Sequence, residues 1–334
     1  MKIIKKLFSL ILRLSISVIL LILLFKFKNI DIKALFENIK NIDKSLLFLA
    51  GFIFSLNYLL CFLRWRMLLA ATGIHLPVIR LITSFCGGVF FNLFLPSTIG
   101  GDVARSIDLA AYTKRPSEVV ATVFLDRLSG YIGLVILVLF SLFLGWGLIR
   151  DNTSVIISVV IITVILIGVL LFLFNNFLFS KVNRYLHSPD AGRIRQALKN
   201  LHHDIHHFRT HKRMIINNLL LSIAIQMTSP ISAYMIALSL GLKIKIIYFF
   251  IFLPIIGAIT LLPISIGGLG LRENLTVFFF VKVGVAENPA LLISLLTFFF
   301  LLICGALGGL IYVLTVHTRR IQYSKTSPVN PANQ

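Results

Sequence analysis

Charged residues are scarce in this chain of 334 residues. Asp, Glu, Lys and Arg make up 13% of the sequence, hydrophobic residues make up 58%, and the mean hydropathy is +0.96. This composition excludes a soluble domain. Several apolar runs reach the roughly 20 residues that a helix needs to cross a hydrocarbon core of about 30 Å. We therefore predict an all-α, polytopic membrane protein that forms one domain over residues 1–334.

Acidic residues are the rarer charged type, because 12 Asp and Glu stand against 32 Lys and Arg, a formal net charge of +20. Most of the positive charge lies between the apolar runs, which is typical of a protein at an anionic membrane surface. Nucleic acid binding is the rival interpretation of this charge. We expect no nucleic-acid partner, since no soluble basic domain is present to hold one.

Cysteine is also rare, and Cys61, Cys86 and Cys304 all lie in apolar segments. This placement supports neither a disulfide framework, nor a zinc site, nor a thiol nucleophile. We expect no metal and no cofactor.

Histidines gather in the basic segment 181–213. His202 with His206, and His203 with His207, have the i,i+4 spacing that can hold a metal ion. An apolar seam along the same segment leaves these histidines on its wetter sides. The pattern favours a cytosolic, basic amphipathic helix that lies on anionic lipid.

Hydropathy predicts about six full spans and two further apolar segments. Pro and Gly cluster in the two further segments, so we expect broken helices or re-entrant hairpins there rather than straight spans. The full spans lie near 8–25, 46–63, 119–149, 154–177, 214–240 and 289–316, and the broken segments at about 79–99 and 247–283.

The distribution of Lys and Arg predicts the orientation, because these residues are enriched in cytoplasmic loops. Lys2 and Lys5 place the N-terminus in the cytosol, and Arg319 and Arg320 place the C-terminus there. The first apolar stretch runs to Phe25 without a small-x-small cleavage site, which indicates a retained span rather than a signal peptide. We predict a multi-pass protein of the cell (inner or plasma) membrane.

Two loops complete this topology. Arg64, Arg66 and Arg80 predict that the loop after the second span is cytosolic. Segment 26–44 is then external, and the helical spacing of its apolar residues predicts a helix along the outer surface.

One helix-breaking phrase occurs twice. LPSTIGGDVAR begins at Leu95 and LPISIGGLGLR at Leu262, 167 residues later in a chain of 334, and both fit L-P-x-x-I-G-G-x-x-x-R. Three spans separate the two copies, so they enter the membrane from opposite faces. This arrangement predicts an inverted repeat with halves of about 45–177 and 214–316, a plan shared by many alternating-access transporters. Chance similarity between membrane segments is the alternative.

The phrase combines features that bind anions. Pro halts the incoming helix and the paired Gly permits a sharp turn. The next helix begins with unpaired N–H groups and a positive dipole end, which can cradle phosphate, and an Arg one turn later adds a bidentate donor. The alternative is a glycine-packed kink with the Arg snorkelling to the interface. The candidate residues are Pro96, Gly100, Gly101, Asp102, Arg105, Pro263, Gly267, Gly268, Arg272 and Glu273.

Ionised side chains at membrane depth are costly and therefore mark functional candidates. Asp126 and Arg127 lie about two turns inside a predicted span, in VVATVFLDRLSGYIG. With the charged residues of the phrase they form structural ion pairs, such as Asp126 with Arg105, or they bind a lipid head group. In the second case the arginines hold its phosphate, and the carboxylates bind a cationic group or carry a coupling proton.

The sequence gives little support for an enzyme. Paired carboxylates can perform acid–base catalysis, but no nucleophile–base pair, metal spacing or nucleotide loop accompanies them. The glycines from Gly267 to Gly270 lack the flanking strand that a dinucleotide fold requires. We expect no catalytic residues.

Three stretches, LFLPSTIGGDVAR, VFLDRLSG and LLPISIGGLGLRE, occur in this order along the chain. With them the chain resembles the lysylphosphatidylglycerol synthase/flippase-type family of integral membrane proteins, relatives of the membrane region of the multiple peptide resistance factor. The likeness covers roughly residues 7–316. It implies a flippase-like domain that moves a phospholipid or a polyprenyl-linked lipid across the bilayer. By the same resemblance the path would be lined by Asp102, Arg105, Asp126, Arg127, Arg272 and Glu273.

The resemblance stops before one feature of the resistance factor, in which a soluble transferase domain follows the membrane region. Here only VHTRRIQYSKTSPVNPANQ follows the last predicted span. We therefore do not expect this chain to transfer a lysyl group by itself. A role beside a separately encoded transferase, a small-solute secondary transporter and a structural scaffold are the alternatives.

Overall fold

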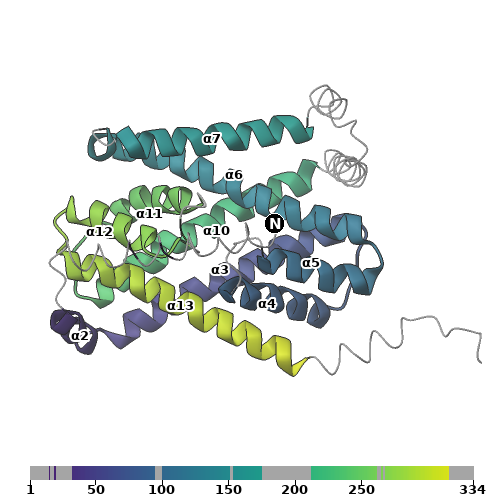
Figure 1. Ribbon diagram of the computed structural model, residues 1–334, viewed down its shortest axis with the longest axis horizontal. Helices are drawn as coiled ribbons and strands as arrows, with labels where there is room; N and C mark the ends of the chain where they lie inside the picture. Colours follow the sequence, from purple (N-terminus) through teal and green to yellow (C-terminus); the bar gives the residue numbers. More distant parts are fainter. Residues whose placement is uncertain are drawn as a thin grey trace, which may run out of the picture.

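The computed structural model describes residues 15, 19, 32–94, 100–150, 153–174, 212–261, 265 and 268–315. Over these ranges the regular elements are helices without any β-strand, as predicted. Figure 1 shows them as α2 (Ile32–Lys40), α3 (Lys44–Ala71), α4 (Val78–Phe94), α5 (Gly100–Thr113), α6 (Pro116–Ile149), α7 (Thr153–Phe174), α10 (Lys212–Ser239), α11 (Ile246–Thr260), α12 (Leu271–Val281) and α13 (Glu287–Leu314).

Four helices are long and apolar enough to cross a membrane: α3, α6, α10 from Arg213 onward, and α13. They confirm four of the predicted spans. The span predicted at 154–177 corresponds to α7, whose described apolar stretch is the shorter Val155–Ile165. The span predicted at 8–25 lies outside the described residues, apart from two single positions.

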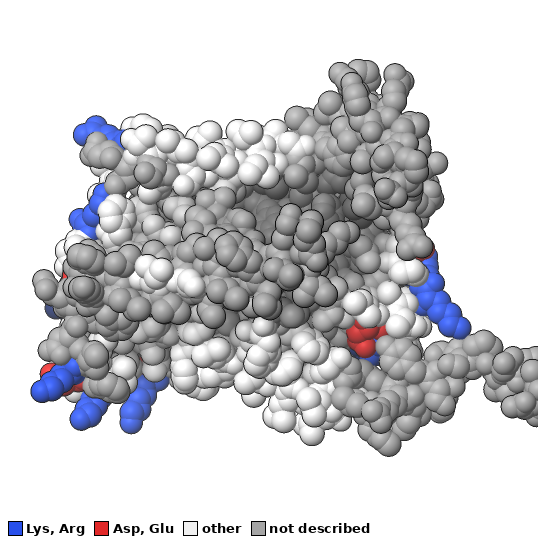
Figure 2. All heavy atoms as spheres, viewed as in Figure 1, with Lys and Arg blue, Asp and Glu red and all other residues white. Residues whose placement is uncertain are grey.

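The surface has the layering expected of a membrane protein. In Figure 2 the Lys and Arg side chains on the visible face gather at the two ends of the molecule, and the described atoms between them are uncharged. Large apolar side chains such as Phe48 and Phe143 are about four-fifths exposed, at 79% and 81%. Apolar exposure on this scale suits contact with lipid rather than water. The chain is therefore a multi-pass membrane protein.

The surface helix predicted in segment 26–44 is α2. Leu35 on this helix is buried, and so is Ile42 just beyond it, whereas Ile39 is exposed. Helix α2 packs against α13 at one end of the molecule. Leu35 and Ile39 share the predicted apolar face, so this face is buried only in part.

The two segments that carry the repeated phrase are broken into pairs of short helices, as predicted. Helix α4 packs on α5, and α11 packs on α12. In Figure 1 the α4–α5 pair lies toward the right end of the molecule and the α11–α12 pair toward the left, with the long helices running between. Each pair thus occupies one end of the bundle.

The helix order long, short, short, long occurs twice, first as α3–α6 and then as α10–α13. Helices α10 and α11 begin 168 residues after α3 and α4, at 212 against 44 and at 246 against 78. Helices α12 and α13 begin 171 residues after α5 and α6, at 271 against 100 and at 287 against 116. The two runs therefore share one helix order, and the repeat halves of 45–177 and 214–316 stay a prediction.

Two apolar clusters hold the short helices in place. The larger cluster packs α11 on α12 through aromatic rings. The centroids of the tilted pair Phe249 and Phe280 lie 4.8 Å apart, and those of the stacked pair Phe252 and Phe279 lie 5.1 Å apart. Aromatic pairs at such distances add to the stabilisation from area burial. The smaller cluster lies under α3, α4, α5 and α6 and is centred on the fully buried Trp65.

A close contact between backbones fixes the α4–α5 pair. A Cβ atom at Gly101 would overlap the carbonyl oxygen of Gly88 and also meet the side chain of Asn92. The Gly101 N–H donates to Asn92 Oδ1 at 2.9 Å. The second glycine of the first phrase is therefore required for close helix packing. In the second phrase Gly268 and Gly270 have φ of +79° and +78°, a conformation that favours glycine.

We expect the Gly101→Ala substitution to destabilise the protein by roughly 1–3 kcal/mol, because the added methyl group must push two backbones apart. Gly147→Ala on α6 is the matched control, since nothing lies within 4 Å of the added Cβ there. This control should leave stability unchanged or raise it by about 0.5–1 kcal/mol. The free energy of unfolding in detergent micelles measures both variants. Equal effects would contradict the close-packing role of Gly101.

Candidate functional site

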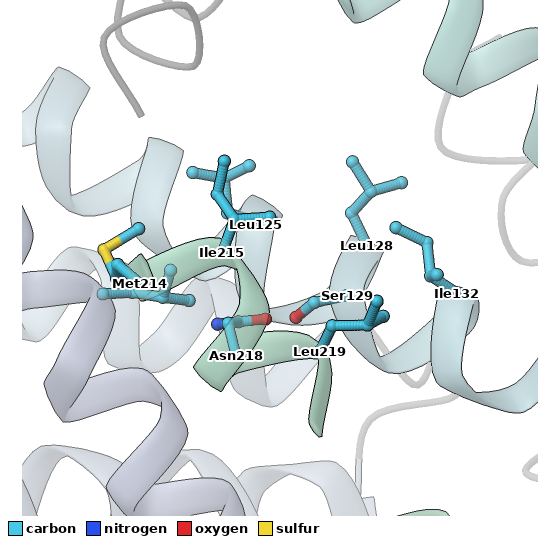
Figure 3. Close-up of a pocket in the computed structure, with 9 residues that line it drawn as sticks. Leu125, Leu128, Ser129, Ile132, Met214, Ile215, Asn218 and Leu219 are labelled. Carbon is cyan, nitrogen blue, oxygen red and sulfur yellow. The ribbon is translucent and has the colours of Figure 1, made fainter. Parts of the chain in front are cut away.

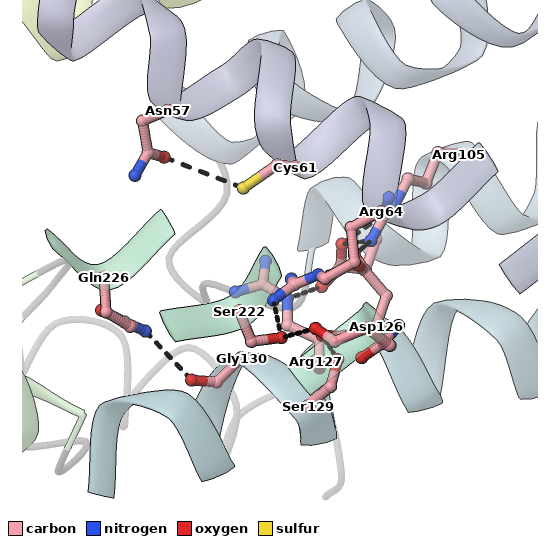
Figure 4. Close-up of polar contacts among 12 residues, drawn as sticks. Asn57, Cys61, Arg64, Arg105, Asp126, Arg127, Ser129, Gly130, Ser222 and Gln226 are labelled. Carbon is pink, nitrogen blue, oxygen red and sulfur yellow. Dashed lines mark hydrogen bonds and ion pairs between the residues drawn. The ribbon is translucent and has the colours of Figure 1, made fainter. Parts of the chain in front are cut away.

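A chain of buried charges joins several helices near the α4–α5 pair. Asp126 on α6 lies at its centre and accepts from Arg64 Nε of α3 at 2.7 Å and from Arg105 Nη2 of α5 at 2.8 Å (Figure 4). All three side chains are at least nine-tenths buried. The predicted pairing of Asp126 with Arg105 is confirmed.

Asp102 extends this chain from α5 back to α6. Its carboxylate accepts from Arg105 Nη2 at 2.9 Å and Nε at 3.0 Å, and its other oxygen accepts from Arg127 Nε. Arg127 is the most open member, with a side chain that is 34% exposed. Arg105 thus bridges both aspartates, and Arg127 is partly exposed at the surface of the protein.

Helix α10 contributes neutral polar groups to the same region. Arg64 Nη1 donates to Ser222 Oγ at 3.0 Å, and Gln226 Nε2 donates to the Gly130 carbonyl at 3.0 Å (Figure 4). A Cβ at Gly130 would lie 3.2 Å from Arg64 Nη1, so glycine leaves room for the guanidinium. We define Arg64, Asp102, Arg105, Asp126, Arg127 and Ser222 as the arginine–aspartate cluster.

Two observations concern the charge balance and the hydrogen bonds of this cluster within the described residues. Its three arginines and two aspartates leave one net positive charge. Arg105 is 4% exposed, and its Nη1 has no hydrogen-bond partner among the described residues. Its guanidinium lies 4.7 Å from the ring centroid of Trp65, which favours a cation but supplies no acceptor for that N–H.

The arginine–aspartate cluster lines a cavity of about 230 Å³. Uncharged polar side chains from α3 and α4 face the same space, and aromatic and small residues complete its wall. The described lining residues are Asn57, Tyr58, Cys61, Arg64, Phe85, Gly88, Val89, Asn92, Asp102, Arg105, Asp126 and Arg127. A cavity with donors on several sides and net positive charge can bind a small anion.

The second copy of the phrase forms a separate and smaller cluster. Arg272 Nη2 donates to Glu273 Oε1 at 2.7 Å, and Arg272 Nε lies 3.3 Å from Ser294 Oγ of α13. The Arg272 guanidinium lies 5.2 Å from the ring centroid of Phe298. Glu273 is 1% exposed and also accepts from the Gly270 N–H at 2.6 Å. This pair is neutral.

The structure therefore gathers some of the predicted residues and separates others. Asp102, Arg105, Asp126 and Arg127 share one cavity, and Gly100 and Gly101 begin the helix that carries the first two. Arg272 and Glu273 belong to the α11–α12 end, where Gly268 precedes α12. Pro96, Pro263, Gly267 and segment 181–211 lie outside the described residues.

Two helix N-terminal donors that the phrase predicts for phosphate already have protein partners. Asn92 accepts from the Gly101 N–H, and Glu273 accepts from the Gly270 N–H. These two backbone groups are therefore not available to an anion, whereas Arg105 Nη1 has no described partner.

Sequence reasoning missed Arg64. It assigned Arg64, Arg66 and Arg80 to a cytosolic loop, but all three lie on helices, because α3 continues to Ala71 and α4 begins at Val78. The cytosolic side of this region stays a prediction. Arg64 and Arg80 are 5% and 2% exposed, and Arg80 pairs with Asp108 at 3.0 Å. A signal was present, because Asn57, Cys61 and Arg64 follow the i, i+4, i+7 spacing of one helix face.

Metal chemistry has no candidate in the described part of the chain, where no group of three or more His, Cys, Asp and Glu side chains gathers. The His202–His207 pairs lie outside the described residues.

The fold and site define a class: a multi-pass, all-α membrane protein with a cavity that is lined by buried arginines and aspartates beside its α4–α5 pair. The chain belongs to the family described as the lysylphosphatidylglycerol synthase TM region, which it matches over residues 10–309. It is similar to a UPF0104 membrane protein of Pyrococcus horikoshii, with 22% identity over 277 residues that cover 76% of this chain and 82% of the relative. No solved structure matches the chain significantly.

We expect Asp126→Asn to destabilise the protein by about 3–5 kcal/mol, because it leaves Arg64 and Arg105 facing each other without their shared carboxylate. Arg115→Gln is the control, since it removes an exposed pair with Glu118 and should cost about 0–1 kcal/mol. Unfolding in detergent micelles measures both. Similar small losses would show that the charge chain is not a structural element.

Proposed function

We propose that this protein binds the phosphate of a membrane lipid head group in the cavity of the arginine–aspartate cluster and passes the head group between leaflets. The observation that carries the proposal is the incomplete charge balance of that cavity. One positive charge remains among its described charged residues, and Arg105 Nη1 lacks a described acceptor.

The chemistry of the cavity favours phosphate. Each arginine of the cluster has an aspartate partner, but the three guanidinium groups share two carboxylates, so a further anion in the cavity is stabilised. Guanidinium groups present parallel N–H donors that match the oxygens of a phosphodiester. In a bilayer the abundant anions of this kind are phospholipid head groups. The family description, which refers to the membrane region of a phospholipid-modifying synthase, points to the same substrate class.

The arrangement of the short helices supports movement across the membrane. The α4–α5 and α11–α12 pairs lie at opposite ends of the bundle, and each follows a long helix in the same order. In an inverted repeat with this plan, each broken pair closes the path from one face, and the two close alternately. The arginine–aspartate cluster is then the head-group site on the side of one face. Arg272 with Glu273 is the head-group site on the side of the other.

Two further assignments belong to the same proposal. Both termini lie in the cytosol, and the basic segment 181–213 rests on the anionic inner leaflet of the cell membrane. The α4–α5 pair then faces the cytosol, and the α11–α12 pair faces the outside.

Leaflet exchange of a head-group-labelled phosphatidylglycerol in proteoliposomes tests the proposal. The native chain should exchange the lipid well above protein-free vesicles, and Arg105→Glu or Arg272→Glu should abolish exchange. Arg127→Gln, at the most open member of the cluster, should reduce exchange at least tenfold, the loss of one charge-assisted hydrogen bond of about 1.5–3 kcal/mol. Arg66 lies on α3 two residues after Arg64 and is exposed, so Arg66→Gln should leave exchange unchanged.

The comparison of Arg127→Gln with Arg66→Gln decides between outcomes. Equal exchange by both variants, with both inserted and folded, would contradict an anion site at the cluster. Absence of exchange by the native chain with anionic, zwitterionic and polyprenyl lipids would contradict lipid translocation itself.

A further inference from the structure

A second cavity lies among α3, α6 and α10 and has the opposite character. It measures about 280 Å³, and its wall is almost wholly aliphatic. Figure 3 shows Leu125 and Leu128 of α6 on one side and residues of α10 below them. The described lining residues are Leu68, Leu125, Leu128, Ser129, Ile132, Met214, Ile215, Asn218 and Leu219.

One polar side chain in this wall lacks a protein acceptor. Asn218 is 5% exposed, and its Nδ2 has no hydrogen-bond partner within the described part of the chain. A buried amide donor without an acceptor costs about 1–3 kcal/mol. Native proteins retain few such groups, and many of those serve a ligand or an ordered water.

The apolar cavity adjoins the arginine–aspartate cluster through a short polar link. Ser222 Oγ accepts from Arg64 Nη1 at 3.0 Å and donates to the main-chain carbonyl oxygen of Asn218 at 2.7 Å. On α6, Leu125 lines the apolar cavity and the next residue, Asp126, lines the charged one. Asn218 therefore lines the apolar cavity one helical turn from Ser222, which contacts Arg64 in the wall of the charged cavity.

This order of surfaces matches the order of groups in one class of lipid. A diacyl glycerophospholipid carries a phosphate, then a glycerol with ester carbonyls, then hydrocarbon chains. A polyprenyl phosphate passes from phosphate to hydrocarbon without a carbonyl. An N–H donor placed between a cationic cavity and an aliphatic one therefore distinguishes the two classes.

We propose that the cavity among α3, α6 and α10 is an acyl-ester subsite, in which one fatty acyl chain lies against the leucines and its ester carbonyl accepts from Asn218 Nδ2. This inference rests on the proposed function, because it places the phosphate of the same lipid at the arginine–aspartate cluster. It specifies that the substrate is an ester-linked glycerophospholipid. The three helices that form the cavity are all long enough to span a membrane, so hydrocarbon chains are the surrounding solvent.

Competitive photolabelling tests the subsite. The full chain in detergent micelles is labelled with a trace of phosphatidylglycerol that carries a diazirine in one acyl chain. Unlabelled diacyl phosphatidylglycerol competes in one series and its dialkyl ether analogue in another. The native chain should prefer the diacyl competitor by about fivefold to tenfold, as one net hydrogen bond implies. The labelled peptides should come from α3, α6 and α10.

Two variants separate the parts of the subsite. Asn218→Leu should remove the preference for the ester-linked competitor without loss of folding stability, because it replaces an amide that lacks a described acceptor with an apolar group of similar size. Ile132→Phe should fill the cavity and lower labelling at least fivefold. Ile136→Phe, one turn further along α6 on its 40% exposed position, is the matched control and should label like the native chain.

The same experiment with Arg127→Gln distinguishes this inference from the proposed function. Weaker binding by Arg127→Gln together with a native ester preference in Asn218→Leu, or equal labelling of Ile132→Phe and Ile136→Phe, would overturn the acyl-ester subsite alone. Equal competition by the two lipids in the native chain would overturn it as well, and would leave the cavity to water or to unselected hydrocarbon. If Arg127→Gln binds the lipid like the native chain and Asn218→Leu keeps the native preference for the diacyl competitor, both proposals are overturned.

Discussion

The structure depends on one constraint: charge inside a membrane must be compensated where it lies. Asp126 meets this constraint by joining Arg64 and Arg105, and Asp102 meets it by joining Arg105 and Arg127. These contacts tie α3, α5 and α6 into one unit, and Ser222 attaches α10 to it. Within the described residues the three arginines exceed the two aspartates by one charge, and Arg105 Nη1 has no hydrogen-bond partner. A site of this kind is stable as a scaffold and still attracts an anion.

The rest of the fold holds the arginine–aspartate cluster beside the α4–α5 pair. In the smaller apolar cluster the Trp65 ring packs against the Arg105 guanidinium, and the contact between Gly88 and Gly101 holds α5 against α4. The α11–α12 end has a different solution, in which Arg272 and Glu273 neutralise each other. The two ends therefore share a helix order but differ in charge.

Much of this architecture follows from periodicity and composition. Apolar runs predicted the four long spans, and Pro and Gly predicted the broken helices. The pairing of Asp126 with Arg105 followed from the cost of burying either charge alone. Arg64 was missed because a hydropathy window ends at the first arginine, whereas a helix ends only where its backbone bonds do. The sequence predicted that the two copies enter from opposite faces, but it did not show that Arg105 and Arg272 form separate clusters, because a shared phrase fixes local structure and not the partners of each side chain.

The most direct test of the central claim is whether a lipid phosphate completes the charge balance of the cluster. Thermal unfolding of the native chain in neutral detergent should shift upward more with phosphatidylglycerol than with diacylglycerol of the same acyl chains, because a ligand that binds only the folded state stabilises it and only the first lipid brings a phosphate to the cluster. Arg127→Gln leaves two arginines and two aspartates, so its melting temperature should respond equally to both lipids. A native chain that responds equally to both, or an Arg127→Gln variant with the full phosphatidylglycerol shift, would contradict the account.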